Sequence, residues 1–289
     1  MPSTQSNNLP STPVVLTSPD GNTQATVHVA GIAPEQYKRI SDYLGTELNR
    51  PSQSYIGVSK AMQMALELCP SANPADLWVH LIYYEFRNRF KKSDQSWKRV
   101  GGQAWEHTIL TIYNHRLKES GVSIRFSKPD DAKTLGLVER GLGNSKTDLV
   151  LEFKTNNGRA VIFGVIHGKL SIAERLTDDA PASVALIQQG YWSSVVTMDN
   201  KMFPPPHGNG LVRGELGKTK TSDKRFYFEV AGQFSGCYSF NLRTPPSAET
   251  TPSGSKINTL SFSENQPDIL VRDILGALAK FQEIRKLSS

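Results

Sequence analysis

Two consecutive apolar segments constrain the fold of this chain more than any other feature of its sequence. The segments "DLVLEFK" (148–154) and "AVIFGVIHGK" (160–169) are rich in β-branched and aromatic residues, and only "TNNGR" separates them. A short connection that contains Asn-Gly is typical of a β-hairpin. The two segments are therefore predicted to be antiparallel neighbours in a sheet.

Helical periodicity precedes this hairpin, and strands and helices alternate after it. Between Ala33 and Leu117, apolar residues recur at three- and four-residue intervals in four segments, which predicts four helices. Further strands are predicted at 25–31, 122–126, 193–199, 226–234 and 236–242, and further helices at 170–176, 180–192 and 268–287. This order predicts an α/β fold with a mixed central β-sheet flanked by helices and a helical N-terminal region.

The 289 residues are predicted to form one domain behind a short tail. Residues 1–20 are rich in Ser, Thr, Pro and Asn, which is typical of a flexible tail. The single domain then covers 21–289. Its parts are a helical part at 33–120, a sheet core at 121–200, and a region at 201–289 with a long loop, late strands and a closing helix.

The composition excludes several classes of protein. No apolar run approaches the ~20 residues of a membrane-spanning helix, and the N-terminus lacks the layout of a signal peptide. Two cysteines are too few for a disulfide framework. Walker, G-x-S-x-G and H-E-x-x-H patterns are absent from the sequence. We therefore expect a cytoplasmic protein with no membrane partner.

The charge pattern favours binding to a polyanion. The formal net charge is +6, and two segments, 85–99 and 201–225, each carry six Lys or Arg against two acids. Such segments can contact phosphates without reading sequence. An ordinary solvated surface is the alternative interpretation of each segment taken alone.

The predicted hairpin brings polar side chains together at one end. Pairing across the turn makes the numbers of paired residues sum to 314, which places Asp148 opposite Ile166. A carboxylate then lies beside His167 and Lys169 at the end of the partner strand. Hydrolysis of a phosphodiester needs a cation that neutralises developing charge and activates water, and oxygen ligands hold such a cation. This end of the sheet is therefore the predicted catalytic site.

The arrangement resembles the PD-(D/E)xK nuclease superfamily, most closely the type II restriction endonucleases, over about residues 98–199. The resemblance rests on "SKTDLVLEF", "VIHGK" and "VGGQAWEHTIL". It implies that Asp148 is the principal metal ligand and that Lys169 positions or activates the attacking water. It also implies that the main-chain carbonyl of Gly168 is a further ligand and that Glu106 is a supporting acid.

The sequence departs from the family pattern at His167, where the family usually has Glu or Asp. Because imidazole is a poor ligand for Mg²⁺, His167 is expected to contact the metal through a water or to act as a base. Mg²⁺ is the expected cofactor, with Mn²⁺ as the alternative. A literal match, "PD" at 129–130 with Glu152 and Lys154, competes with this assignment. It is disfavoured because Glu152 and Lys154 lie beside the hairpin turn.

The resemblance implies a type II site-specific deoxyribonuclease that hydrolyses double-stranded DNA as a homodimer or a dimer of dimers. A repair or recombination nuclease of the same superfamily and a non-catalytic DNA-binding protein are the alternatives. The candidate DNA contacts are basic residues after the hairpin: Arg175, Arg213, Lys218, Lys220, Lys224 and Arg225.

Overall fold

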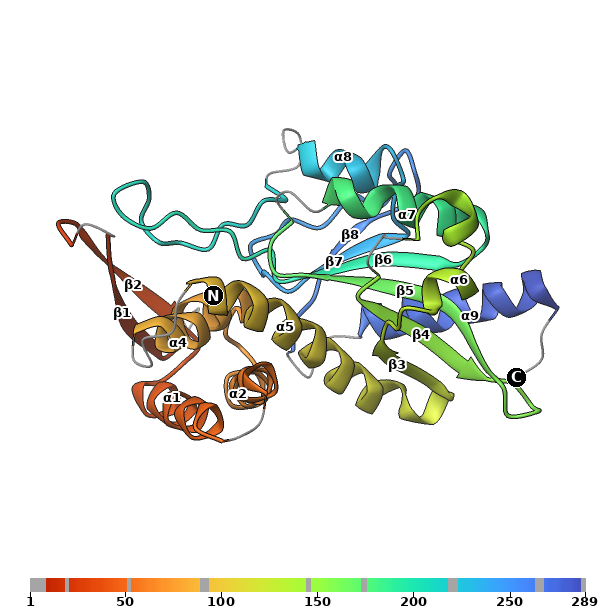
Figure 1. Cartoon of the computed structure of the whole chain (residues 1–289). Coiled ribbons are helices and arrows are strands. Elements are labelled where there is room, and N and C mark those ends of the chain that lie inside the picture. Colours follow the sequence, from red (N-terminus) through yellow and green to blue (C-terminus); the bar gives the residue numbers. More distant parts are fainter. Residues whose placement is uncertain are drawn as a thin grey trace, which may run out of the picture.

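A computed structural model places a helical N-terminal region beside a six-stranded sheet (Figure 1). The structure describes residues 9–18, 21–50, 53–88, 94–143, 147–172, 176–217, 223–262 and 268–286, and all structural statements concern these residues. None of the helices in these ranges combines the length and apolar character that crossing a lipid bilayer requires.

The central sheet is mixed, as predicted. Its strands, in spatial order, are β3 (Val122–Phe126), β4 (Leu149–Lys154), β5 (Ala160–Lys169), β6 (Trp192–Thr197), β7 (Gly236–Ser239) and β8 (Ile257–Thr259). The β3–β4 and β4–β5 pairs are antiparallel, whereas β5 to β8 run parallel. Because β5 and β6 are parallel, a helix has to cross over between them.

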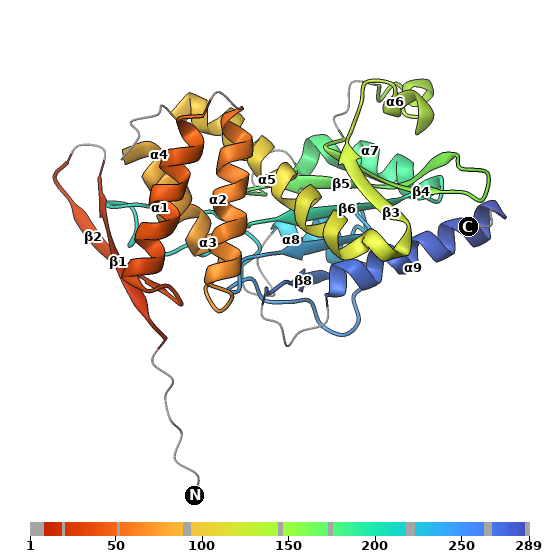
Figure 2. The same ribbon diagram turned by 90° about the horizontal axis from the view of Figure 1, so that it is seen from below.

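Helices cover both faces of this sheet. The N-terminal helical segments are α1 (Pro34–Leu48), α2 (Ser54–Leu68), α3 (Pro74–Leu77), the π-helix η1 (Trp78–Tyr83), α4 (Tyr84–Asn88) and α5 (Asp94–Leu117). The later ones are η2 (Lys118–Ser120), α6 (Asp131–Thr134), η3 (Val138–Arg140), α7 (Leu176–Gln188), α8 (Asp223–Glu229) and α9 (Ile269–Arg285). Figure 2, seen from below, shows α5 and α9 lying across the sheet face that α7 does not cover.

The side chains of β4 and β5 show which helices cover each face of the sheet. Leu149, Leu151 and Ile166 belong to the large core cluster that includes α5 residues such as Ile109. Val150 and Val165 pack instead with Ala182 and Leu186 of α7. The sheet therefore separates an α5 side from an α7 side.

A β-bulge in β5 corrects the predicted register. The pairing beside the turn is as predicted, but the register shifts by one residue and leaves Phe163 without a partner in β4. Beyond the bulge Leu149 pairs with Ile166, so Asp148 falls opposite His167 rather than Ile166. Since side chains alternate along a strand, the bulge turns His167 to the α7 side, where Asp148 also points.

The N-terminal segment departs from the predicted tail. Residues 11–17 form β1 (Ser11–Thr17), which pairs antiparallel with β2 (Gln24–Ala30). Every second residue of β1 is buried, including Val14 and Leu16, which join the main core. The alternation in "STPVVLT" thus marks a half-buried strand that the Ser/Pro-rich composition concealed. Residues 1–8 lie outside the described ranges.

Two predicted elements differ after the hairpin, and one observed strand was not predicted. The helix predicted at 170–176 is absent from Leu170 to Ile172, and 173–175 lie outside the described part of the chain. The strand predicted at 226–234 is wrong, because α8 occupies 223–229 and buries Phe228 and Arg225 on one helical face. Strand β8 was not predicted, since three residues are too short for a detectable period.

Candidate active site

Four polar side chains meet where β4 begins and β5 ends. Lys169 Nζ lies 2.9 Å from Asp148 Oδ2 and 2.7 Å from Asp179 Oδ2, so its ammonium bridges two carboxylates. Nδ1 of His167 lies 3.5 Å from the same Asp179 oxygen. The structure therefore brings together Asp148, His167 and Lys169, as predicted, and adds Asp179 of α7, which sequence reasoning missed.

Backbone pairing on both sides fixes Asp148. Its carbonyl oxygen accepts a hydrogen bond from the Ser127 amide at 3.0 Å, which extends the β3–β4 ladder. Its Oδ2 accepts from the Gly168 amide at 3.0 Å. The carboxylate is thus held between the neighbouring strands before any ligand binds, which favours a preorganised site.

The cluster is largely withdrawn from solvent. The exposed side-chain fractions are 10% for Lys169, 14% for Asp148, 9% for Asp179 and 0% for His167. Burial alone lowers the pKa of Lys169, but the Asp148 and Asp179 carboxylates outweigh it and raise that pKa above its ordinary value. Burial likewise acts to raise the pKa of Asp179, yet His167 and Lys169 hold it below its usual range. Lys169 is therefore held as an ammonium and Asp179 as a carboxylate.

Neighbouring polar and aromatic groups fix the His167 ring. Its Nε2 lies 3.2 Å from Ser193 Oγ of β6, and the edge of Phe234 packs against the ring at 5.6 Å between centroids. Its Nδ1 is buried and makes no hydrogen bond with the residues that the structure describes. His167 is therefore a rigid element of the site with one ring nitrogen unsatisfied.

The residues fit a divalent cation. One ligand atom each from Asp148, His167 and Asp179 lie within 4.8 Å of one another. Carboxylate oxygens are the ligands that hard cations prefer, and Lys169 Nζ shows that the two carboxylates favour positive charge between them. The two acids are thus the natural metal-binding pair, with the imidazole the less suited member.

Glu106 lies on the other side of β5. A methyl group built on Gly168 would lie 3.1 Å from Cγ of Glu106, so α5 approaches the Gly168 backbone closely. Gly168 faces α5, whereas His167 and Lys169 on either side of it face α7. Glu106 is therefore adjacent to the cluster through the backbone, and its role as a supporting acid stays a prediction.

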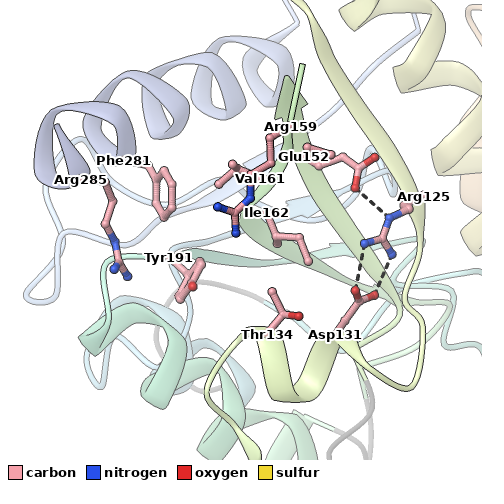
Figure 3. A pocket seen from close by; sticks show the side chains of 11 residues that line it. Arg125, Asp131, Thr134, Glu152, Arg159, Val161, Ile162, Tyr191, Phe281 and Arg285 are labelled. Carbon is pink, nitrogen blue, oxygen red and sulfur yellow. Dashed lines mark hydrogen bonds and ion pairs between the residues drawn. The ribbon is translucent and has the colours of Figure 1, made fainter. Parts of the chain in front are cut away.

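The literal "PD…ExK" pattern forms a different structure. Arg125 pairs with Glu152 at 2.8 Å and with Asp131 at 2.7 Å, while Asp130 and Lys154 are exposed. Figure 3 shows this network beside a pocket of about 510 Å³ at the hairpin-turn end of β5. Nine residues of strand separate that end from Lys169, roughly 30 Å at about 3.3 Å per residue. Glu152, the acid of the competing pattern, is thus already paired with Arg125.

The predicted DNA contacts have different environments. Arg213 is exposed and its side chain makes no ion pair or hydrogen bond within the described ranges. Lys224 is half-buried. Arg225 corrects the prediction: it is 3% exposed, and its guanidinium donates to Glu229 and to the carbonyl oxygen of Pro245. It stabilises α8 and its surroundings instead. Arg175, Lys218 and Lys220 lie outside the described residues.

The sheet topology and the buried acid–lysine cluster define a nuclease of the restriction-endonuclease class, and comparisons with known proteins agree. A family model described as BsaWI restriction endonuclease type 2 matches residues 124–266. The curated "Type II restriction enzyme AgeI" of Thalassovita gelatinovora is 40% identical over 269 residues, which span 88% of this chain and 96% of that protein. The chain belongs to the type II restriction endonucleases.

A solved structure supports the same assignment. The crystal structure of a specific restriction endonuclease AgeI–DNA complex has a TM-score of 0.85 and 36% sequence identity, and the match covers 92% of this chain and 99% of that one. The predicted fold class and enzyme class are confirmed. The protein is a site-specific deoxyribonuclease, and its family depends on a divalent metal.

Proposed function

We propose that this protein cuts both strands of duplex DNA at a short sequence with Mg²⁺ held by Asp148 and Asp179. One observation carries the proposal: Lys169 Nζ lies within 3 Å of an oxygen of each acid, at a strand end that is fixed before ligand binds. When bound, the cation neutralises charge on the phosphate and acidifies the attacking water. Mn²⁺ has the same preference for oxygen ligands.

The chain's own residues divide the remaining work. Hydrolysis adds a hydroxyl group to phosphorus and a proton to the leaving oxygen. Because its raised pKa keeps Lys169 an ammonium, Lys169 serves as a hydrogen-bond donor that orients the water and offsets negative charge. The Gly168 carbonyl is a further proposed ligand, with Glu106 as a supporting acid behind it.

Asp179 takes the place of the second acid that the family pattern puts two residues before the lysine. His167 stands at that sequence position, yet an acid reaches the same region from α7. Asp148 and Asp179 therefore supply two carboxylates, although β5 itself carries no acid. This supports Mg²⁺ over a softer ion.

The loop at 201–217 is the proposed DNA-reading segment. Its backbone is anchored, since the Val212 carbonyl oxygen accepts hydrogen bonds from Asn241 and Arg243, and the Gly214 amide donates to Lys201 at 3.0 Å. Figure 1 shows this loop extending beside the β1–β2 hairpin. Arg213 thus projects from an anchored backbone, which suits contact with a phosphate or a guanine edge.

Replacing Arg213 with alanine is expected to weaken DNA binding. If Arg213 contacts a phosphate, the slope of log affinity against log salt concentration falls by about 1 and all sequences are affected alike. If it reads a base, discrimination at one position falls instead. Gel-shift titrations at several salt concentrations separate the two cases, with exposed Lys280 of α9 replaced by alanine as the control. Unchanged affinity at every salt concentration argues against contact.

The proposed target symmetry implies a second subunit. A single cluster acts on one strand, and the two strands of a two-fold symmetric site are related by rotation. We therefore propose that the protein acts on DNA as a homodimer or a dimer of dimers.

Digestion of phage DNA tests the proposed activity directly. With Mg²⁺ we expect discrete fragments whose ends, once sequenced, share one short sequence. Chelation of the metal should abolish the fragments, and Mn²⁺ should restore cleavage. Fragments with random ends, or cleavage that survives chelation, would overturn the proposal.

A further inference from the structure

The proposed cluster leaves one buried member, His167, without a defined task. We infer that His167 carries its proton on Nδ1, is not a metal ligand, and positions the Asp179 carboxylate. The inference rests on the proposed function only in taking Asp179 as a ligand. It follows from a chain of hydrogen bonds that joins β5, β6 and α7.

The chain begins at Ser183 of α7. Its hydroxyl donates to Ser193 Oγ at 2.7 Å, and Ser193 Oγ lies 3.2 Å from Nε2 of His167. A serine hydroxyl has one proton to donate. Because Ser193 Oγ already accepts from Ser183, we infer that its own proton is donated to Nε2, which then acts as an acceptor. In a neutral imidazole the proton must then be on Nδ1.

The protonated nitrogen faces Asp179. Nδ1 lies 3.5 Å from Asp179 Oδ2 and makes no hydrogen bond with any described residue. At this distance the contact is electrostatic, and it opposes rotation of the carboxylate away from Lys169. A nitrogen that carries a proton has no lone pair to offer a cation, so it cannot coordinate one.

The geometry of α7 closes the arrangement. Asp179 and Ser183 are four residues apart and therefore lie on the same side of the helix. The imidazole contacts Asp179 directly and Ser183 through Ser193. Phe234 packs edge-on against the ring, which is fully buried. The ring thus fixes the rotation of α7 against β5, and with it the direction of the acid.

Two substitutions at His167 separate positioning from ligation. His167→Asn keeps an N–H near the Nδ1 position, whereas His167→Leu fills the space without a donor. Loss of such a supporting contact should raise the half-saturating Mg²⁺ concentration by roughly 10–100-fold in the leucine variant. The asparagine variant should stay close to wild type. Thermal unfolding midpoints measured across a Mg²⁺ titration report this without any cleavage assay.

Two outcomes of this titration would overturn the inference. A leucine variant that binds Mg²⁺ as wild type does would remove the positioning role. Equal weakening in both variants would make His167 a ligand. Ser59→Ala is the matched control, because Ser59 is buried and lies 2.9 Å from a second hydroxyl, that of Thr108. It should lower stability and leave Mg²⁺ affinity unchanged.

The position of the proton can be observed directly. In protein labelled with ¹⁵N-histidine, the signal missing from His167→Asn identifies the residue. We expect the proton on Nδ1, both without metal and at saturating Mg²⁺. A proton on Nε2, or its displacement from Nδ1 by Mg²⁺, would contradict the inference. Failure of Asp179→Asn to change Mg²⁺ affinity would refute the proposed ligand set instead, and leave the proton assignment standing.

Discussion

Replacing Lys169 with methionine is expected to slow DNA cleavage by roughly 10²–10³-fold, the usual cost of removing one hydrogen-bond donor that stabilises developing charge. Methionine keeps the unbranched apolar stem but removes the ammonium that lies between Asp148 and Asp179. Cleavage rates in excess enzyme measure the loss, and gel shifts without metal measure DNA binding. Binding should persist, because Lys169 is 9% exposed and contributes little to the outer surface.

The same substitution has an effect on stability that distinguishes the site from an ordinary ion pair. Without the ammonium, two nearly buried carboxylates face each other with no cation, which is destabilising. Added Mg²⁺ should therefore stabilise the variant more than it stabilises the wild type. Lys154→Met provides the control, since Lys154 is exposed at the other end of the hairpin. Wild-type cleavage by the Lys169 variant would remove this lysine from the mechanism.

Asp179→Asn is expected to reduce cleavage by roughly 10²–10³-fold, because a metal supplies several kcal/mol of charge stabilisation and each 1.4 kcal/mol is tenfold in rate. Asparagine preserves the shape of the side chain and removes only the charge that pairs with Lys169. The reaction should recover partly at high Mg²⁺, since weaker ligation is offset by mass action.

The neighbouring residue supplies the control for Asp179. Asp178 is exposed on the first turn of α7, one position away in the chain, and it takes no part in the cluster. Asp178→Asn changes the same net charge at nearly the same place. It should cut DNA at the wild-type rate, as measured on the same substrate. If both variants lose activity equally, the effect is one of overall charge and Asp179 is not a specific ligand.

The hairpin and three members of the cluster could be predicted because the signals are local. Strand periodicity and the Asn-Gly turn determine which chain ends meet, and they placed Asp148 near Lys169. The place of Asp179 in the cluster could not be predicted from the sequence, for a physical reason. Two adjacent acids begin α7, and which of them points inward depends on how Ala182 and Leu186 dock on the sheet. The sequence period alone carries no such information.

The errors elsewhere have similar causes. The segment of α8 was predicted as a strand because its aromatic residues suggest β structure, and tertiary packing of Phe228 decides otherwise. Arg225 was predicted to bind DNA from its charge alone, without knowledge of the groups that pair with it in the fold. Its partners, Glu229 and the Pro245 carbonyl, become visible only when α8 packs against the loop after β7.

The unpaired Phe163 reverses the alternation of side chains along strand β5, so odd-numbered residues face opposite sides of the sheet before and after it. Next to the turn, odd-numbered residues such as Phe163 pack toward α5. Beyond the bulge, odd-numbered residues such as Lys169 point toward α7. If Phe163 were paired without a bulge, Asp148 would lie opposite Ile166, and Lys169 would point to the other face of the sheet. The geometry of the proposed active site thus depends on a one-residue offset inside the strand, several positions before Lys169.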